Sequence, residues 1–143
     1  MSRLSADEAR TRFAGARVAH LATTSADGHP HVVPCTFALL GEATLVSAVD
    51  DKPKRTPALR RLANLAANPR VALLADHYSE SWDALWWARA DGTARVVEPG
   101  AEPELRAAAI EALAARYAPY RDRPPAGALI VVAVERWSGW RAA

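Results

Sequence analysis

The sequence RVAHLATTSADGHPHVVPCTFALLGEATLVSAV spans residues 17–49 and contains three segments whose side chains alternate as they do in β-strands. The turn sequence Ala26-Asp-Gly-His-Pro30 separates the first two segments, and Gly28 within it can adopt a positive φ angle. Gly41-Glu42 separates the second from the third. Short turns join antiparallel neighbours, so the pattern predicts a three-stranded meander. Its strands are expected at residues 17–24, 31–40 and 43–49.

Helices and further strands are predicted on both sides of the meander. Ser5-Ala-Asp-Glu8 has the form of a capping box and predicts a helix over residues 6–14. Two more helices are expected, one from Pro57 to the Asn68-Pro69 stop signal and one beginning at Glu102-Pro-Glu104. Further strands are expected at residues 70–76, 85–97 and 128–137. Asp91-Gly92, inside the second of these, is compatible with a hairpin turn or with a bulge in one strand.

The predicted elements indicate the fold class. Six or so strands with helices peripheral to them imply a small antiparallel barrel of the α+β class. The chain has 143 residues, of which 50% are hydrophobic and 24% are charged, values typical of one globular domain over residues 1–143.

Composition also narrows the expected location and partners. The longest apolar run, residues 127–134, is far shorter than the ~20 residues of a membrane span, and the first residues lack a signal-peptide core. The single cysteine, Cys35, cannot form an internal disulfide. A net charge of +2 is low for a nucleic-acid-binding protein. We therefore expect a soluble cytoplasmic protein that binds neither membranes nor nucleic acids.

A basic segment follows the third predicted strand. Of the 18 lysines and arginines, the only two lysines are Lys52 and Lys54, and Arg55 and Arg61 lie close by. Cationic side chains between a strand end and a helix start suit a phosphate or carboxylate ligand. A solvated surface loop is the alternative interpretation.

Tryptophans form a second cluster. Five of the ten aromatic residues are tryptophans, and they occur in two short stretches. Trp86 and Trp87 must point to opposite faces of a strand, so only one of them can enter the core. The other needs a subunit interface, a planar ligand or solvent. Together with the basic segment, the tryptophan cluster favours a ligand that consists of a planar heterocycle and an anionic tail.

Other site chemistry is poorly supported by the sequence. Dinucleotide-binding, P-loop, zinc-protease and nucleophile-elbow motifs are all missing. His29, His31 and Cys35 alternate along a predicted strand, and His77 could approach them, but such alternation is commoner in a half-buried strand. We therefore predict no metal site and name no catalytic residue.

The order of these segments resembles a known superfamily. The similarity rests on Asp27-Gly-His-Pro-His-Val-Val-Pro34, Asp51-Lys-Pro-Lys54, the run from Leu62 to Val71 and Leu85-Trp-Trp-Ala-Arg-Ala-Asp-Gly-Thr-Ala94. This pattern is similar to that of the pyridoxamine 5′-phosphate oxidase-like (PPOX class) proteins, in particular the actinobacterial oxidoreductases that use the deazaflavin coenzyme F420. The resemblance implies a six-stranded antiparallel split β-barrel of the FMN-binding type with peripheral helices. It also implies a bulge at Asp91-Gly92 and a homodimer with cofactor sites between the subunits.

The resemblance also suggests which residues bind the cofactor. Counting forward from Ser47 assigns the cofactor phosphate to Lys52 and Lys54, whereas counting back from Asn68-Pro-Arg70 assigns it to Arg61. We favour the two lysines, with Arg55 and Arg61 available to the rest of the anionic tail. The ring and its linker would be lined by Pro34, Thr36, Ser47, Ala48 and Val49, and Trp82 or a neighbour would come from the partner subunit.

The activity that the resemblance implies is hydride transfer between reduced F420 and an unidentified small organic substrate. An FMN-binding oxidoreductase of the same fold is the first alternative, and the longer basic run favours F420 over it. A non-enzymatic cofactor carrier, or a haem-binding protein that uses a histidine, is the second. The candidate histidines are His20, His29, His31 and His77, of which His31 and His77 are also conceivable proton donors.

Overall fold

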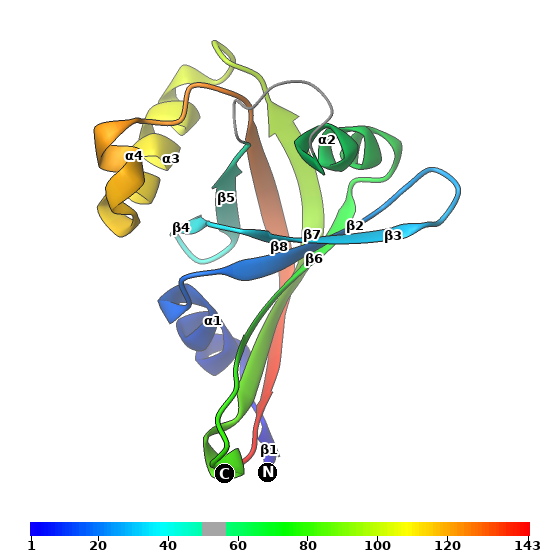
Figure 1. Ribbon diagram of the computed structural model, residues 1–143, viewed down its shortest axis with the longest axis vertical. Coiled ribbons are helices and arrows are strands. Elements are labelled where there is room, and N and C mark those ends of the chain that lie inside the picture. The colour runs from blue at the N-terminus through cyan, green and yellow to red at the C-terminus, as the bar shows by residue number, and fades with distance from the viewer. Residues whose placement is uncertain (50–56) are drawn as a thin grey trace.

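A computed structural model describes residues 1–49 and 57–143 of the chain (Figure 1). Four strands follow one another after the first helix, and the two longest strands, of 12 and 13 residues, lie in the C-terminal half of the chain. In chain order the elements are β1 (Ser2–Arg3), α1 (Ala6–Gly15), β2 (Ala19–Thr24), β3 (Pro30–Cys35), β4 (Ala38–Leu40), β5 (Thr44–Ala48), α2 (Pro57–Ala67), β6 (Arg70–His77), the 3-10 helix η1 (Trp82–Ala84), β7 (Trp86–Val97), α3 (Pro103–Arg116), α4 (Ala118–Asp122) and β8 (Leu129–Arg141).

The strands form one antiparallel sheet in the order β3-β2-β6-β7-β8-β5-β4, and β1 pairs with the end of β8. The α+β class and the antiparallel barrel-like sheet are therefore confirmed. The described residues contain eight strands where six were expected, because β1 is additional and one predicted strand is divided. The last strand is also longer than predicted, since β8 stays paired with β7 as far as Arg141.

The predicted strand over residues 31–40 is interrupted at Thr36 and Phe37. Before the break β3 pairs with β2, and after it β4 pairs with β5, so the chain changes strand partner there. The backbone N–H of Phe37 donates to the hydroxyl of Tyr117 at 3.2 Å. A side chain from the connection between α3 and α4 thus replaces the strand partner at this point, which no local pattern could indicate.

β7 is one continuous strand with a register shift between Asp91 and Gly92. This excludes the hairpin and confirms a bulge at the predicted position, but the extra, unpaired residue is Glu135 of β8 and not a residue of β7. A side chain at Gly92 would meet the backbone of β8, because an added Cβ would lie 2.1 Å from the carbonyl oxygen of Ala133. The bulge therefore brings the two backbones close together at a position that only glycine can occupy.

The main core lies between α1 and the inner face of the sheet. The capping box is present as predicted, because Ser5 Oγ accepts from the Glu8 N–H at 3.1 Å and Glu8 Oε1 accepts from the Ser5 N–H at 3.0 Å. It starts the helix that carries Ala9 and Phe13 into the core. The ring of Phe13 lies 4.9 Å from that of Phe37, measured between centroids.

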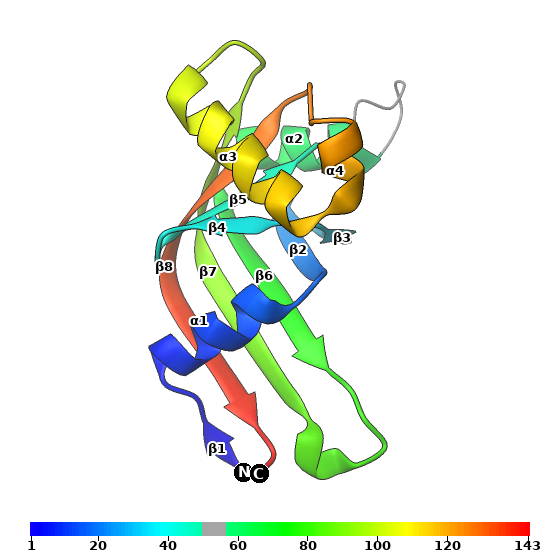
Figure 2. The same cartoon turned by 90° about the vertical axis from the view of Figure 1, so that its left-hand side faces the viewer.

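A second core cluster lies under α3 at the other end of the barrel (Figure 2). Leu113 of α3 packs there against buried side chains of β5, β7 and β8. The short helix α4 follows α3 directly and was not predicted. Its five residues are too few to show a helical repeat in the sequence.

On one face of the sheet, the alternate residues of β3, β2, β6 and most of β7 are exposed or half-buried, and we call this the open face. A row of paired residues crosses this open face, in the order Pro34, His20, Leu74, Arg89 and Ser138. Its β3 end is apolar and accessible, since the side chain of Val32 is 60% exposed and Val18, just before β2, is 46% exposed. None of the helices in the described ranges is long and apolar enough to cross a membrane.

Candidate functional site

A cavity of about 450 Å³ lies at the β3 end of the open face, under α4. Its lining combines apolar, aromatic and cationic groups contributed by five regions of the fold. The lining residues are Val18, Pro34, Cys35, Thr36, Ala48, Arg61, Tyr117, Pro119 and Tyr120. Such a mixture suits a ligand that has a flat apolar part and a charged part.

Hydroxyl groups connect the walls of this cavity. The Thr36 and Tyr120 hydroxyls lie 2.9 Å apart and link the β3–β4 junction to α4. Behind them, Ser47 Oγ donates to the carbonyl oxygen of Thr36 at 2.6 Å and joins the junction to β5. The break between β3 and β4 is therefore held on both sides, which keeps Thr36 turned toward the cavity.

Arg61 supplies the positive charge among the described lining residues. Its Nε is buried and has no hydrogen-bond partner in the described part of the chain. Buried polar groups are normally satisfied, so this N–H is available to an anionic ligand. Burial raises the pKa of the neighbouring Cys35 thiol, although its side-chain contact with Ser47 and the charge of Arg61 oppose the shift. Cys35 is thus a neutral thiol at neutral pH and forms part of the wall.

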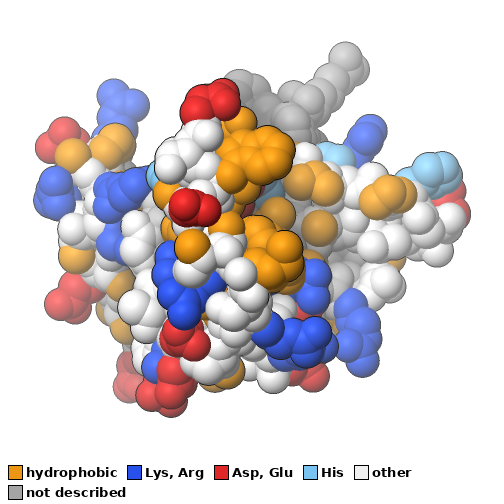
Figure 3. Space-filling model, turned by 90° about the horizontal axis from the view of Figure 1, so that it is seen from below, with side chains coloured by type: hydrophobic (Ala, Val, Ile, Leu, Met, Phe, Trp, Pro, Cys, Tyr) orange, Lys and Arg blue, Asp and Glu red, His pale blue; other side chains and the backbone are white. Residues whose placement is uncertain are grey.

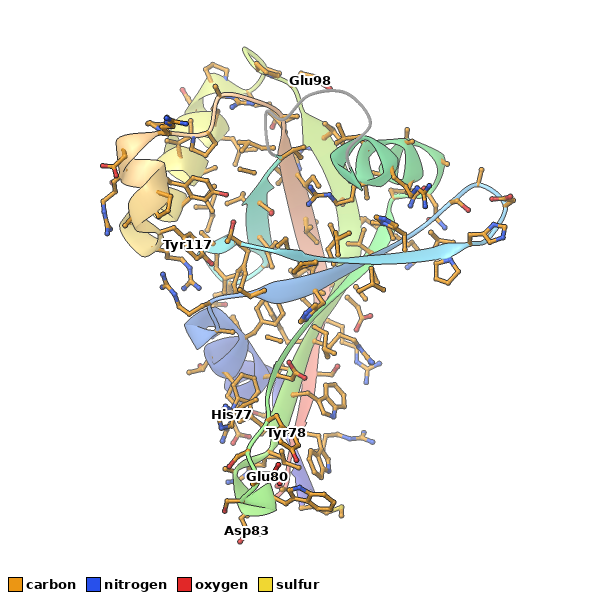
Figure 4. The ribbon with its side chains drawn as sticks, in the orientation of Figure 1. His77, Tyr78, Glu80, Asp83, Glu98 and Tyr117 are labelled. Atoms are coloured by element: carbon orange, nitrogen blue, oxygen red, sulfur yellow. The ribbon has the colours of Figure 1, made fainter. Side chains whose placement is uncertain are left out.

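Tyr117 anchors the helical side of the cavity (Figure 4). Its hydroxyl donates to the carbonyl oxygen of Arg17 at 2.9 Å and accepts the N–H of Phe37 at 3.2 Å. The guanidinium of Arg116 lies 4.9 Å from the centroid of the Phe37 ring and donates to the carbonyl oxygen of Ala14 at 2.7 Å. These contacts tie α3 to α1 and to the β3–β4 junction.

Replacing Tyr117 with phenylalanine is expected to lower the free energy of unfolding by about 1–3 kcal/mol, because the buried N–H of Phe37 loses its acceptor. Urea denaturation measures the change. The matched control is Tyr120→Phe, which removes a less buried hydroxyl and should cost about 1 kcal/mol or less. Equal losses for the two variants would contradict the role assigned to Tyr117.

The cavity contains four of the residues predicted to bind a cofactor, namely Pro34, Thr36, Ala48 and Arg61. Ser47 supports the wall from behind, and Val49 is buried in the main core. Lys52, Lys54 and Arg55 lie outside the described residues. The sequence analysis did not include Val18, Cys35, Tyr117, Pro119 or Tyr120 in the site.

Trp82 lies far from the cavity of its own chain. It belongs to η1, at the end of the sheet where Figure 4 labels Asp83, whereas Tyr117 lies near the other end. Its side chain is 67% exposed, and Tyr78 nearby is also exposed. Figure 3 shows hydrophobic side chains among acidic and basic ones at this end. Within one chain, Trp82 therefore does not reach the cavity.

The histidines are distributed over separate parts of the sheet. His29 and His31 line a small cavity beside Arg60, whereas the ring of His77 stacks on Trp86 at 6.4 Å between centroids. His31 and Cys35 lie at alternating positions of β3 as expected, but His29 precedes the strand and belongs to the turn. No group of three potential metal ligands is found in the described ranges.

Comparison with known proteins identifies relatives of this chain. The family described as Pyridoxamine 5′-phosphate oxidase matches residues 5–141. Among solved structures, a FAD-binding protein from Mesorhizobium loti is similar, with 23% identity, a TM-score of 0.72, and coverage of 96% of this chain and 95% of that one. No curated protein matches the sequence.

Two mycobacterial structures are also similar. A FAD-binding protein from Mycobacterium smegmatis has 21% identity and a TM-score of 0.66, with 99% of this chain and 98% of that one covered. A heme-binding protein from the same organism has 30% identity and a TM-score of 0.71. That match covers 98% of this chain but only 55% of the other protein.

Proposed function

Because this chain belongs to the pyridoxamine 5′-phosphate oxidase family, we propose that it is an oxidoreductase that binds a flavin-type cofactor in the cavity under α4. The observation that carries the proposal is the buried Nε of Arg61, which has no hydrogen-bond partner among the described residues and lies in a cavity whose other described walls are largely apolar and aromatic. That pairing suits a flat ring joined to an anionic tail. The FAD-binding names of two similar structures support the same class of ligand.

The side chains of this cavity fit such a cofactor. Arg61 would bind its anionic tail, and we propose that Lys52, Lys54 and Arg55 contribute to the same contact. Pro34, Ala48, Tyr117 and Tyr120 would line the ring. When bound and reduced, the cofactor supplies a hydride to the substrate.

The protein's own part in the reaction is binding and positioning. Thr36 and Tyr120 join the β3–β4 junction to α4 through their hydroxyl contact, and this would hold one wall of the cavity in place beside the ring. Cys35 stays a neutral thiol, since burial raises its pKa, so it adds no charge that would oppose an anionic ligand. None of these steps requires a catalytic acid or base from the chain.

Among flavin-type cofactors we favour coenzyme F420, as the sequence resemblance implies. F420 presents a phosphodiester and several carboxylates over a longer span than the terminal phosphate of FMN. The basic run from Lys52 to Arg61 matches the longer tail. FMN and FAD are the alternatives within this proposal, and the names of the similar structures support FAD.

We further propose that two chains associate through the β3 end of the open face. The exposed Val18 and Val32 lie there, and Val18 also lines the cavity, so a second chain would cover its mouth. In that dimer Trp82 of the partner would complete the site, as the resemblance implies. If analytical ultracentrifugation showed that the purified protein is a monomer, this arrangement would be contradicted.

Haem binding is a second candidate, because a heme-binding protein is 30% identical to this chain. No histidine is among the described residues that line the cavity, which favours the flavin-type ligand there. Haem reconstitution that produces a Soret band, lost when His20, His29, His31 or His77 is replaced, would support this candidate instead.

The decisive experiment measures the affinity of the protein for F420, FMN and FAD separately. Replacing Lys52 and Lys54 together with alanine should weaken binding of the preferred cofactor by about 2–4 kcal/mol, as expected for lost charge-assisted hydrogen bonds. Replacing Arg61 with glutamine should weaken it by about 1.5–3 kcal/mol. Arg95→Gln is the control, because Arg95 pairs with Glu102 at 2.8 Å and does not line the cavity. Tight FMN or FAD binding without F420 binding would remove the F420 assignment, and no binding of any of the three would remove the proposal.

A further inference from the structure

Helix α2 brings Arg61 to the cavity under α4, and it packs against the sheet beside β2 and β7 (Figure 1). Within residues 60–67, the part of the helix whose side chains are described, only Asn64 and Leu65 are buried. Leu65 and the half-buried Leu62 pack into the main core. Because apolar packing is non-directional, these leucines hold α2 on the sheet without fixing its rotation about its own axis.

Asn64 adds the directional contact that the leucines lack. Its Nδ2 donates to the hydroxyl of Thr23 on β2 at 3.0 Å, and the two residues are 5% and 2% exposed. No other side-chain hydrogen bond joins α2 to a strand in the part of the chain that the structure describes. A hydrogen bond depends on the angle at the donor as well as on the distance. A rotation of α2 would therefore break this bond and leave two buried polar groups unpaired, which destabilises the fold.

Asparagine is not the residue that helix formation or burial alone would favour at this position. It is a poorer helix former than leucine, and its amide group must be hydrogen-bonded when it is buried. A leucine would extend the apolar surface formed by Leu62 and Leu65. What the position gains from Asn64 is the hydrogen bond to Thr23, which specifies one orientation of the helix.

The orientation of α2 determines where Arg61 points. Arg61 precedes Asn64 by three residues, so the two side chains leave neighbouring parts of the helix surface. The Arg61 Nε is buried and has no hydrogen-bond partner among the described residues. Within those residues, the position of the guanidinium therefore depends on the helix that carries it. The charge of Arg61 also acts on Cys35, which lines the same cavity, and lowers the pKa of its thiol against the effect of burial.

We propose that Asn64 is a positioning residue, whose hydrogen bond to Thr23 fixes the rotation of α2 and thereby holds the Arg61 guanidinium in the cavity under α4. Asn64 itself does not line this cavity. Its effect on cofactor affinity rests on the proposed function, whereas its effect on the place of Arg61 beside Cys35 does not. The two effects can therefore be measured separately.

The first experiment replaces both partners of the hydrogen bond and measures the thiol. Asn64→Leu combined with Thr23→Val removes the bond without leaving an unpaired polar group, so stability should change little. The chain has one cysteine, and in this double variant the pKa of the Cys35 thiol should rise, because Arg61 moves away from it. The pH dependence of iodoacetamide alkylation measures this pKa in the cofactor-free protein. Arg61→Gln should raise it as well, and the double substitution should add no further rise in that background.

The second experiment measures the affinity for whichever of F420, FMN and FAD the protein binds. The double variant should bind this cofactor about three- to tenfold more weakly, and it should have no further effect in the Arg61→Gln background. Asn68→Ala is the matched control. Asn68 follows the end of α2, and its Oδ1 accepts from the Arg70 N–H at 3.1 Å at an exposed position. This control should change neither the thiol pKa nor the cofactor affinity.

Three results would each overturn the proposal. They are an unchanged thiol pKa in the folded double variant, an equal change in Asn68→Ala, and an equal effect of the double substitution in the native and Arg61→Gln backgrounds. Urea denaturation shows whether each variant is folded. If none of the three cofactors binds, the proposed function fails, and the thiol measurement still decides the role of Asn64.

Discussion

Replacing Gly92 with alanine should lower the free energy of unfolding by about 3–5 kcal/mol, at the upper end of single-substitution effects. The new Cβ would lie 2.1 Å from the carbonyl oxygen of Ala133 and 3.1 Å from the Cα of Val134. Both atoms belong to the backbone of β8, so no side-chain rotation relieves the clash. The two strands must separate at the bulge, and the hydrogen bonds of the longest strand pair are weakened there. Chemical denaturation followed by circular dichroism measures the loss.

Gly15→Ala is the control for this substitution. Gly15 is the last residue of α1, and an added Cβ there would meet no atom within 4 Å. Its expected effect is within about 0.5 kcal/mol, as for surface substitutions in general. A Gly92→Ala protein as stable as the Gly15→Ala protein would show that β7 and β8 do not approach as closely as described.

Replacing Phe13 with alanine should destabilise the fold by about 3–5 kcal/mol, the usual cost of removing a buried phenylalanine. Phe13 is fully buried, with its ring 4.9 Å from the Phe37 ring and 5.3 Å from the Trp137 ring. The three rings join α1, the β3–β4 junction and β8. Because α1 carries only Ala9 and Phe13 as buried residues, it has little else to hold it against the sheet.

A second substitution distinguishes the loss of apolar volume at Phe13 from the loss of its contacts with the other two rings. Phe13→Leu keeps most of the apolar volume and should cost about 1–2 kcal/mol. Hydrogen exchange should show the amides of α1 less protected in Phe13→Ala than in Phe13→Leu. Equal protection of the α1 amides in the two variants would mean that contacts other than this aromatic cluster hold α1 against the sheet.

Local patterns were sufficient to predict most of the sheet. The strand at 70–76, the capping box at Ser5 and the turn at Gly28 all depend on residues within one short segment, and the structure contains each of them. The break at Phe37 could not be predicted in this way. It depends on the Tyr117 hydroxyl, which is 80 residues away in the sequence.

The residues of the candidate site were predicted only in part, because contacts between distant parts of the chain place some of them. Arg61 came from counting back from Asn68-Pro-Arg70 in a family pattern, and it lies in the cavity. Tyr117 was assigned only to the apolar stripe of a helix, because its polar contacts are made with distant backbone atoms. Tyr120 belongs to a helix too short to leave a periodic signal, so the sequence contained no indication that it faces the cavity.

The position of β3 at the edge of the sheet has a consequence for aggregation. An edge strand normally offers unpaired amide groups to which another extended chain can add, as in fibril growth. β3 has only six residues, and Pro30 and Pro34 are two of them. Proline has no amide hydrogen, so this edge is a poor template for the addition of further strands. The chain can therefore keep an exposed apolar surface next to this edge with little risk of polymerising through it.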